Sequence, residues 1–335
     1  MPLSEIFSKS FEDYKKNWKL IFRGYFWLNV LPYLVMMLVL FGMLFFLIDA
    51  IMTSATAIVP EDFLNGEGLY SLTGNAIGSG EMQLIKAVLP VVILAVAFFV
   101  IYIILTFILN LSIYYASLNN EKGKLTFKEA ARGGIRYFWR ILGLCILLFL
   151  IFLFFLLLIS IPILITSLLW AISPLALKVI LVLICVIVGI LIVLFTIYLW
   201  ISWLFAVYVI IKENSGIVNS LSRSRELVRG RWWLTFGYFL LISIILWIIS
   251  YIINALSGLI SLLFERGMNP LLASQSYSLL VVLGFFSVIV AYIFQLIARV
   301  LTFPYSVFFF KNIYYEYAGF GVKGSKKKKS RRKGK

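Results

Sequence analysis

The sequence predicts an all-α integral membrane protein with about six transmembrane helices, and three observations support this prediction. Of the 335 residues, 63% are hydrophobic and 13% are charged, whereas soluble domains contain roughly 45–50% apolar and about 25% charged residues. The mean hydropathy is +1.04. Six apolar runs each exceed the roughly 20 residues that cross a bilayer. No soluble core could bury this much apolar surface, so lipid must surround most of it.

The apolar runs are long, and several exceed 30 residues, so they must tilt, kink or project into the headgroup region. We expect Pro162 to kink the third run, and Pro304 to end the sixth and to start an interfacial segment. A re-entrant hairpin inside one long run is the alternative to six simple spans. The six runs are Tyr25–Met52, Lys86–Ser117, Trp139–Ile172, Ala176–Ile211, Trp232–Phe264 and Ser278–Phe310.

Lysine and arginine gather on one side of these predicted spans. The N-terminal segment, the second–third and fourth–fifth connections and the stretch from Lys311 onward hold nearly all of them. The opposite side holds only Lys86, Lys178 and Arg266. The positive-inside rule therefore predicts a multi-pass membrane protein with both termini in the cytoplasm.

The connections on the opposite side differ in length. Thr53–Glu81 is acidic and rich in Gly and Ser, so we expect it to be irregular. A tight turn is expected at Ser173-Pro174, and a short loop around Arg266–Pro270. The membrane domain is expected to comprise residues 1–317, and the polybasic residues 318–335 to form a disordered cytoplasmic tail.

An internal repeat organises the predicted spans. Ser8–Trp18 can be laid on Ser222–Trp232, with two Ser, one Glu and the Trp identical, and Glu129–Trp139 is a looser third copy. Each copy runs into an apolar hairpin. The sequence therefore predicts three helical hairpins, each preceded by a short basic amphipathic helix, in units of about 4–118, 119–211 and 212–317.

The short helices are expected to lie in the inner leaflet, with lysine and arginine toward anionic headgroups. Their tryptophans, Trp18, Trp139 and Trp232, would be interfacial anchors. The alternative is that these segments are only positively charged loops that fix the topology. In the first copy, the residues expected to face the acyl boundary are Ile6, Phe7, Phe11 and Tyr14.

Two stretches of the second half carry a resemblance to a known family. Lys212–Gly216 followed by Ser220–Trp233, together with Phe303–Tyr305 leading to Ile313–Tyr317, resembles the membrane domain of the glycerophosphoryl diester phosphodiesterase membrane-domain family. The first half resembles it by topology only. In some members this region is fused to a soluble phosphodiesterase domain, for which this chain has no room. The resemblance implies a fold and a membrane, expected to be the plasma membrane, and no catalytic activity.

Charged and polar residues within the spans are candidates for functional sites, because burying a charge there costs at least a few kcal/mol. Arg299 lies in the sixth run, with Gln295 one turn earlier. Arg299 would grip a lipid phosphate or an anionic solute, or pair with Glu213. Alternatively it reaches the headgroups, because the helix from Ser278 to Arg299 already extends about 33 Å.

The other candidates are cations and amides. Four arginines of the fourth–fifth connection are candidate contacts for a lipid, an anion or a partner protein: Arg223, Arg225, Arg229 and Arg231. Three amides are expected to form interhelical hydrogen bonds or to line a transport path: Asn29, Asn110 and Asn254.

The sequence argues against catalysis. Histidine is absent, and Cys145 and Cys185 lie in apolar runs, where we expect them to act as small hydrophobic residues. We find no glycine-rich nucleotide loop, no metal-ligand cluster and no acidic pair suited to acid–base chemistry. No enzyme activity, metal or cofactor is therefore expected.

The leading hypothesis is a non-catalytic membrane protein that organises lipids or partner proteins at the inner leaflet. Anionic lipids are the expected partners of the basic segments, with a protein partner as a further possibility and no specific nucleic acid. The alternative is a transporter or lipid translocator, although inverted repeats are the commoner transporter device. An intramembrane enzyme would need a polar cavity that gathers Gln295, Arg299 and Glu213.

Overall fold

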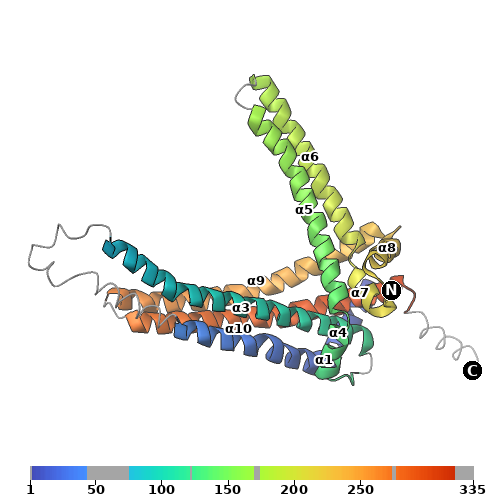
Figure 1. Cartoon of the computed structure of the whole chain (residues 1–335). Coiled ribbons are helices and arrows are strands. Elements are labelled where there is room, and N and C mark those ends of the chain that lie inside the picture. Colours follow the sequence, from blue (N-terminus) through green and yellow to red (C-terminus); the bar gives the residue numbers. More distant parts are fainter. Residues whose placement is uncertain (1, 44–74, 121–122, 170–173, 274–276, 321–335) are drawn as a thin grey trace, which may run out of the picture. The chain divides into compact units, whose positions relative to one another are not determined.

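The computed structural model describes residues 2–43, 75–120, 123–169, 174–273 and 277–320. Every regular element in this part of the chain is helical (Figure 1). The elements are α1 (Leu3–Tyr25), the π-helix η1 (Phe26–Val30), α3 (Asn75–Asn119), α4 (Phe127–Ile135), α5 (Phe138–Leu169), α6 (Leu175–Ser202), α7 (Ala206–Glu213), α8 (Ile217–Val228), α9 (Trp232–Ala273) and α10 (Tyr277–Tyr317).

Six helical stretches are long and apolar enough to cross a membrane, as predicted. Few of their side chains are buried by the rest of the protein, so lipid must cover the remainder. The chain is therefore a multi-pass membrane protein. The six stretches are Leu3–Met43, Val88–Asn119, Phe138–Leu168, Leu177–Glu213, Trp232–Gly267 and Val282–Tyr317.

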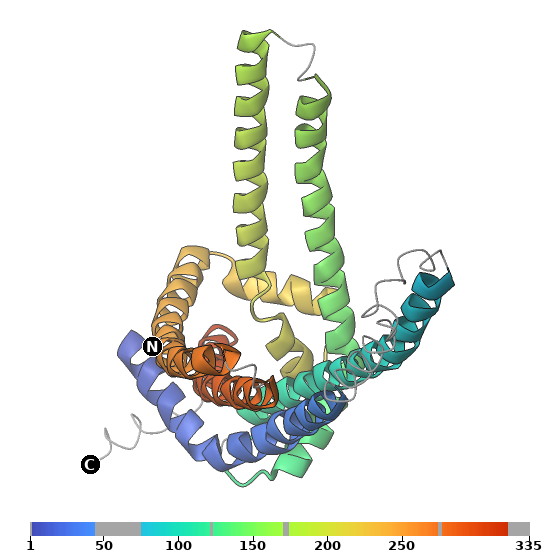
Figure 2. The ribbon, with the colours of Figure 1, turned by 90° about the vertical axis from the view of Figure 1, so that its left-hand side faces the viewer.

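The chain divides into two compact units. The first comprises Met1–Ile21, Leu111–Leu256 and Ile297–Lys335, and the second comprises Phe22–Asn110 and Ser257–Leu296. The first unit holds α4 to α8, most of α1, and parts of α3, α9 and α10. It therefore includes all three segments that the sequence predicted to be short basic helices. Within it, α5 and α6 form an antiparallel hairpin (Figure 2) whose base contacts α8.

The core of the first unit surrounds α7. This helix is short, and five of its eight residues are buried. The Tyr208 hydroxyl donates a hydrogen bond to the Val307 carbonyl (2.9 Å), and its ring stacks on that of Tyr314. The largest fully buried side chains of the unit include Tyr314, Phe205, Phe308, Phe309, Ile113 and Leu118.

The first short helix is not separate from the first span, in contrast to the predicted arrangement. Helix α1 continues through the π-helix η1 into a further α-helical stretch that reaches residue 43. π-helices are rare and occur mostly as single turns inside α-helices. The basic segment and the apolar segment are thus one helix with a π-turn at their junction.

Pro304 does not end the last helix, so that prediction was wrong. Because proline has no N–H, the carbonyl of Val300 loses its helical partner. The hydroxyl of Tyr14 donates a hydrogen bond to this carbonyl (3.2 Å), and α10 continues to Tyr317. A tyrosine from α1 therefore replaces the missing backbone donor.

Two predicted loops are helical. The stretch around Arg266–Pro270 lies within α9, which runs to Ala273. Residues 75–81 of the predicted irregular connection form the start of α3, while its residues 53–74 fall outside the described part of the chain. The predicted turn at Ser173 and most of the basic tail also fall outside the described part of the chain. Helix α5 continues through Pro162 to Leu169.

Candidate functional site

The three short helices each bury one face, at residues four apart. The buried pairs are Ser10 and Tyr14 in α1, Ala130 and Gly134 in α4, and Ser224 and Val228 in α8. Residues four apart lie one above the other on a helix. Basic residues of these segments lie outside the buried positions, and those that are exposed include Lys15, Lys19, Arg132 and Arg225.

The buried face of α1 packs on α10. Ile6 is fully buried, and the ring of Phe7 lies 5.0 Å from that of Phe309. Phe11 is 60% exposed. Of the four residues expected to face the acyl boundary, Ile6 and Tyr14 are therefore covered by protein, and that expectation was wrong for them.

Buried polar contacts fix α1 in place. The ammonium of Lys311 on α10 forms an ion pair with Asp13. The amide of Asn312 donates to the Ser10 hydroxyl (3.0 Å), and the amide of Asn120 donates to the side-chain oxygen of Asn17 (2.7 Å). These contacts leave the lysines of α1 on the opposite, outward face.

Helix α8 is attached through its own buried serine. The Ser224 hydroxyl donates to the carbonyl of Ser202 (2.8 Å) and accepts from the backbone N–H of Phe205 (3.1 Å). Ser202 is the last residue of α6, and Phe205 is the N-cap of α7. A single hydroxyl thus bridges two helix ends that would otherwise leave backbone groups without partners.

A turn at Asn214 joins α7 to α8 and is held by charged groups. Asn214 has φ +53°, a left-handed conformation that asparagine tolerates better than most residues. Arg140 donates to its side-chain oxygen (2.6 Å). Next to it, Glu213 accepts from the Tyr314 hydroxyl (2.9 Å) and lies 3.6 Å from Arg223.

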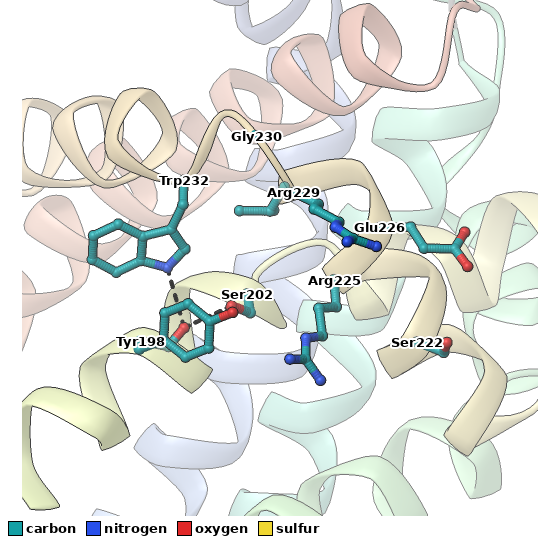
Figure 3. Close-up of a pocket in the computed structure, with 9 residues that line it drawn as sticks. Tyr198, Ser202, Ser222, Arg225, Glu226, Arg229, Gly230 and Trp232 are labelled. Carbon is teal, nitrogen blue, oxygen red and sulfur yellow. Dashed lines mark hydrogen bonds between the residues drawn. The ribbon is translucent and has the colours of Figure 1, made fainter.

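A cavity of about 480 Å³ lies where α8 meets α6 and the start of α9. Figure 3 shows Tyr198 and Trp232 on one side of it, and the side chains of α8 on the other. The Trp232 indole N–H donates to the carbonyl of Tyr198 (3.2 Å). The lining residues are Tyr198, Ser202, Ser222, Arg225, Glu226, Val228, Arg229, Gly230 and Trp232.

The four candidate arginines have different surroundings. Arg225 and Arg229 line the cavity. Arg223 pairs with Glu226 (3.2 Å) as well as with Glu213. Arg231 lies over the ring of Tyr317, 5.0 Å from its centroid. Only two of the four are therefore placed to contact one bound group.

The other candidates do not join this cavity. Gln295 and Arg299 are exposed, one turn apart on α10, and neither is among its lining residues. Glu213 is held by Tyr314 and Arg223. None of these three residues lines the cavity at α8, the cavity beside Lys124 and Lys212, or the cavity beside Thr166 and Cys185.

The three tryptophans are exposed to different degrees. Trp139 is 78% exposed and Trp18 is 41% exposed, whereas Trp232 is partly buried against the cavity. Their role as interfacial anchors stays a prediction.

A separate polar cluster lies inside the second unit. The amide of Asn29, on the π-helix η1, donates to the hydroxyls of Tyr102 (3.0 Å) and Thr106 (3.4 Å). Its oxygen accepts from the Tyr292 hydroxyl (2.7 Å). Asn29 therefore makes interhelical hydrogen bonds, as predicted, whereas the amide of Asn254 donates within its own helix to Ser250.

The carboxyl group of Glu129, outside the spans, has a lowered pKa with a clear physical cause. It forms a capping box with Thr126 at the start of α4. Hydrogen bonds from the Thr126 backbone and side chain lower the pKa of the Glu129 carboxyl. Among the described residues, no group of three His, Cys, Asp or Glu side chains could hold a metal ion.

Sequence reasoning missed Tyr198 and Ser202 as cavity residues, because both lie in an apolar run that gives no sign of facing a polar group. It also missed the Asp13–Lys311 pair, whose members are nearly 300 residues apart. No family model, curated protein or solved structure matches the chain. The family resemblance described from the sequence stays a prediction.

Proposed function

We propose that this multi-pass membrane protein is non-catalytic and organises anionic lipids at the inner leaflet of the plasma membrane. Both termini would lie in the cytoplasm, and a partner protein could bind the same surface. The observation that carries the proposal is the division of the short helices into two faces. Their buried faces are occupied by protein, and their outward faces are basic.

The basic outward faces have few countercharges. Lys15 and Lys19 are exposed on α1, and Arg132 and Arg136 are exposed at the end of α4. Glu12 and Lys16 form an exposed pair at 3.8 Å. Each basic residue near an anionic leaflet contributes about 1 kcal/mol of attraction. The lysines and arginines of residues 326–333 would add to this attraction.

The buried faces argue for an organising role rather than reversible attachment. A peripheral amphipathic helix needs lipid to cover its apolar face. Here Ile6, Tyr14, Ser224 and Val228 are covered by other helices, so the cations keep their positions without lipid. Anionic headgroups would then gather around a fixed pattern of charge.

The test is mass spectrometry of the protein in native-lipid nanodiscs, identifying every retained lipid and protein. We expect selective retention of anionic lipid by the wild type and at least about tenfold less by a variant with Arg223, Arg225, Arg229 and Arg231 changed to Ala. A matched variant changes Lys326–Lys329 to Ala, which removes the same charge from the tail. Retention of lipid only in the proportions of the bulk membrane, with no recurrent partner, would refute the proposal.

A transporter or lipid translocator is the second candidate. The polar cluster around Asn29, at a π-turn inside a span, supports it, because π-turns occur frequently at functional sites. The exposed pair of Gln295 and Arg299 on α10 is a further polar feature within a span. Solute flux in proteoliposomes that disappears in Arg299→Ala would favour this candidate. Membership of the glycerophosphoryl diester phosphodiesterase membrane-domain family is compatible with either.

A further inference from the structure

We propose that the cavity between α8, the end of α6 and the start of α9 binds one anionic phospholipid, with Arg225 and Arg229 holding its phosphate. This inference rests on the proposed function, and it names the site and the class of ligand. The cavity lies entirely within the first unit.

The charge of the cavity favours an anion. Arg225 and Arg229 are four residues apart, so their side chains emerge on the same side of the helix. Neither guanidinium has an ion-pair partner among the residues that the structure describes. Glu226 is the one acid in the lining, and its carboxylate lies 3.2 Å from Arg223. Two uncompensated positive charges therefore remain.

The donors suit a phosphate in particular. A guanidinium presents its N–H groups in a planar fork that matches two phosphate oxygens. Ser222 is a further lining residue and carries a hydroxyl group. The volume of about 480 Å³ has room for a headgroup together with its glycerol.

The opposite wall of the cavity is aromatic, which favours a lipid over a soluble phosphate ester. The rings of Tyr198 and Trp232 stack with centroids 5.8 Å apart, and Trp232 stacks on Phe236 at 5.2 Å. Phe195 stacks on Tyr198 from the other direction. The stack leads from the arginines into α6 and α9, two helices long and apolar enough to span a membrane. Acyl chains could follow this path while the phosphate stays at the arginines.

A glycine turn forms part of the cavity wall. Gly230 lines the cavity with φ +79°, and the space where a Cβ would stand holds no atom within 4 Å. A residue with a side chain would be strained there. The glycine lets the chain reverse from α8 into α9 and places Trp232 directly opposite Arg225 and Arg229 (Figure 3).

The experiment titrates dioctanoyl phosphatidylglycerol into the purified full-length protein and counts bound lipid by native mass spectrometry. We expect one tight site in the wild type, about tenfold weaker binding for Arg225→Ala or Arg229→Ala, and about 100-fold weaker binding for the double variant. The matched control is the double variant Arg132→Ala and Arg136→Ala, which removes two exposed arginines at the same spacing outside the cavity. It should weaken the tight site less than about threefold.

The double variant Arg225→Lys and Arg229→Lys keeps the charge of the cavity. Lysine binds phosphate as a point charge without the planar fork. The affinity of this variant for phosphatidylglycerol should therefore fall between those of the wild type and the double alanine variant. Dioctanoyl phosphatidylcholine, which has the same phosphodiester but no net charge, should not occupy the tight site.

Three results would overturn the assignment. Equal losses in the two double alanine variants would mean that diffuse charge retains the lipid, which removes the cavity but leaves the proposed function. Displacement by glycerol 3-phosphate at the affinity of the lipid would identify a site for soluble phosphate esters. No retention of phosphatidylglycerol by the wild type would overturn both this inference and the proposed function.

Discussion

Changing Asp13 to Ala tests how strongly α1 is fastened to α10. The side chain of Lys311 is 4% exposed and that of Asp13 is 14% exposed, so removal of the carboxylate leaves a buried ammonium without its counterion. Breaking a buried pair in this way costs about 3–5 kcal/mol. Lys311 also lies 5.4 Å from the centroid of the Tyr315 ring, an attraction that persists in the variant. We therefore expect Asp13→Ala to lower the free energy of unfolding by about 3 kcal/mol, the lower end of this range.

The free energy of unfolding can be measured by denaturant titration in micelles, followed by tryptophan fluorescence. Asp13→Ala combined with Lys311→Met should recover more than half of the loss, because an apolar pair of similar size is often as stable as the ion pair. The exposed pair of Glu12 and Lys16 is the control, and Glu12→Ala should cost about 0.5 kcal/mol or less. Equal losses for Asp13→Ala and Glu12→Ala, or no recovery in the double variant, would refute the reasoning.

Three further predictions concern packing, polar contacts and pH. Gly134→Ala should lower the free energy of unfolding by about 1–3 kcal/mol, because a Cβ there would lie 2.9 Å from the backbone of Leu111. Gly42→Ala is the control and should be close to neutral in the same titration, because a Cβ at position 42 would have no atom within 4 Å. Asn29→Leu should lower the free energy of unfolding by about 2 kcal/mol, since interhelical hydrogen bonds in membranes average about 0.6 kcal/mol each and this amide makes three. An unchanged midpoint of the denaturant titration would show that the cluster is not stabilising. The lowered pKa of Glu129 means that its contribution to α4 is present above the ordinary carboxyl pKa and is lost as pH falls through the lowered value. Protection against hydrogen exchange at the start of α4, corrected for the intrinsic exchange rate at each pH, should therefore decrease in acid, and Glu129→Gln should remove most of this pH dependence.

The six spans could be predicted from the sequence because their signal is local. Any window of about 20 apolar residues must find an apolar solvent, whatever the rest of the chain does. The boundaries were harder, as the last helix illustrates. Pro304 has the local signature of a helix end, and only the distant hydroxyl of Tyr14 compensates for its missing N–H. No local pattern contains that information.

The candidate site was half predictable for a similar reason. The basic residues of α8 stand out in an apolar chain, so Arg225 and Arg229 could be singled out with their neighbours. The sequence could not separate them from Arg223, which is neutralised by Glu213 and Glu226. That distinction depends on how α7 and α8 fold against each other around the left-handed turn at Asn214.

The uneven similarity of the three copies has a physical explanation in the buried faces of their short helices. In α1 and α8 the buried serine forms a hydrogen bond to another element, Ser10 with Asn312 and Ser224 with Ser202. A hydroxyl at that position has a specific partner, so the two segments share a serine there.

The remaining short helix, α4, is fastened without such a bond. Its buried residues are Ala130 and Gly134, and Gly134 approaches the backbone of Leu111 too closely for any side chain. Close backbone contact requires small residues rather than a hydroxyl. The three short helices are therefore attached through different buried contacts, a serine hydrogen bond in α1 and α8 and a close backbone approach in α4.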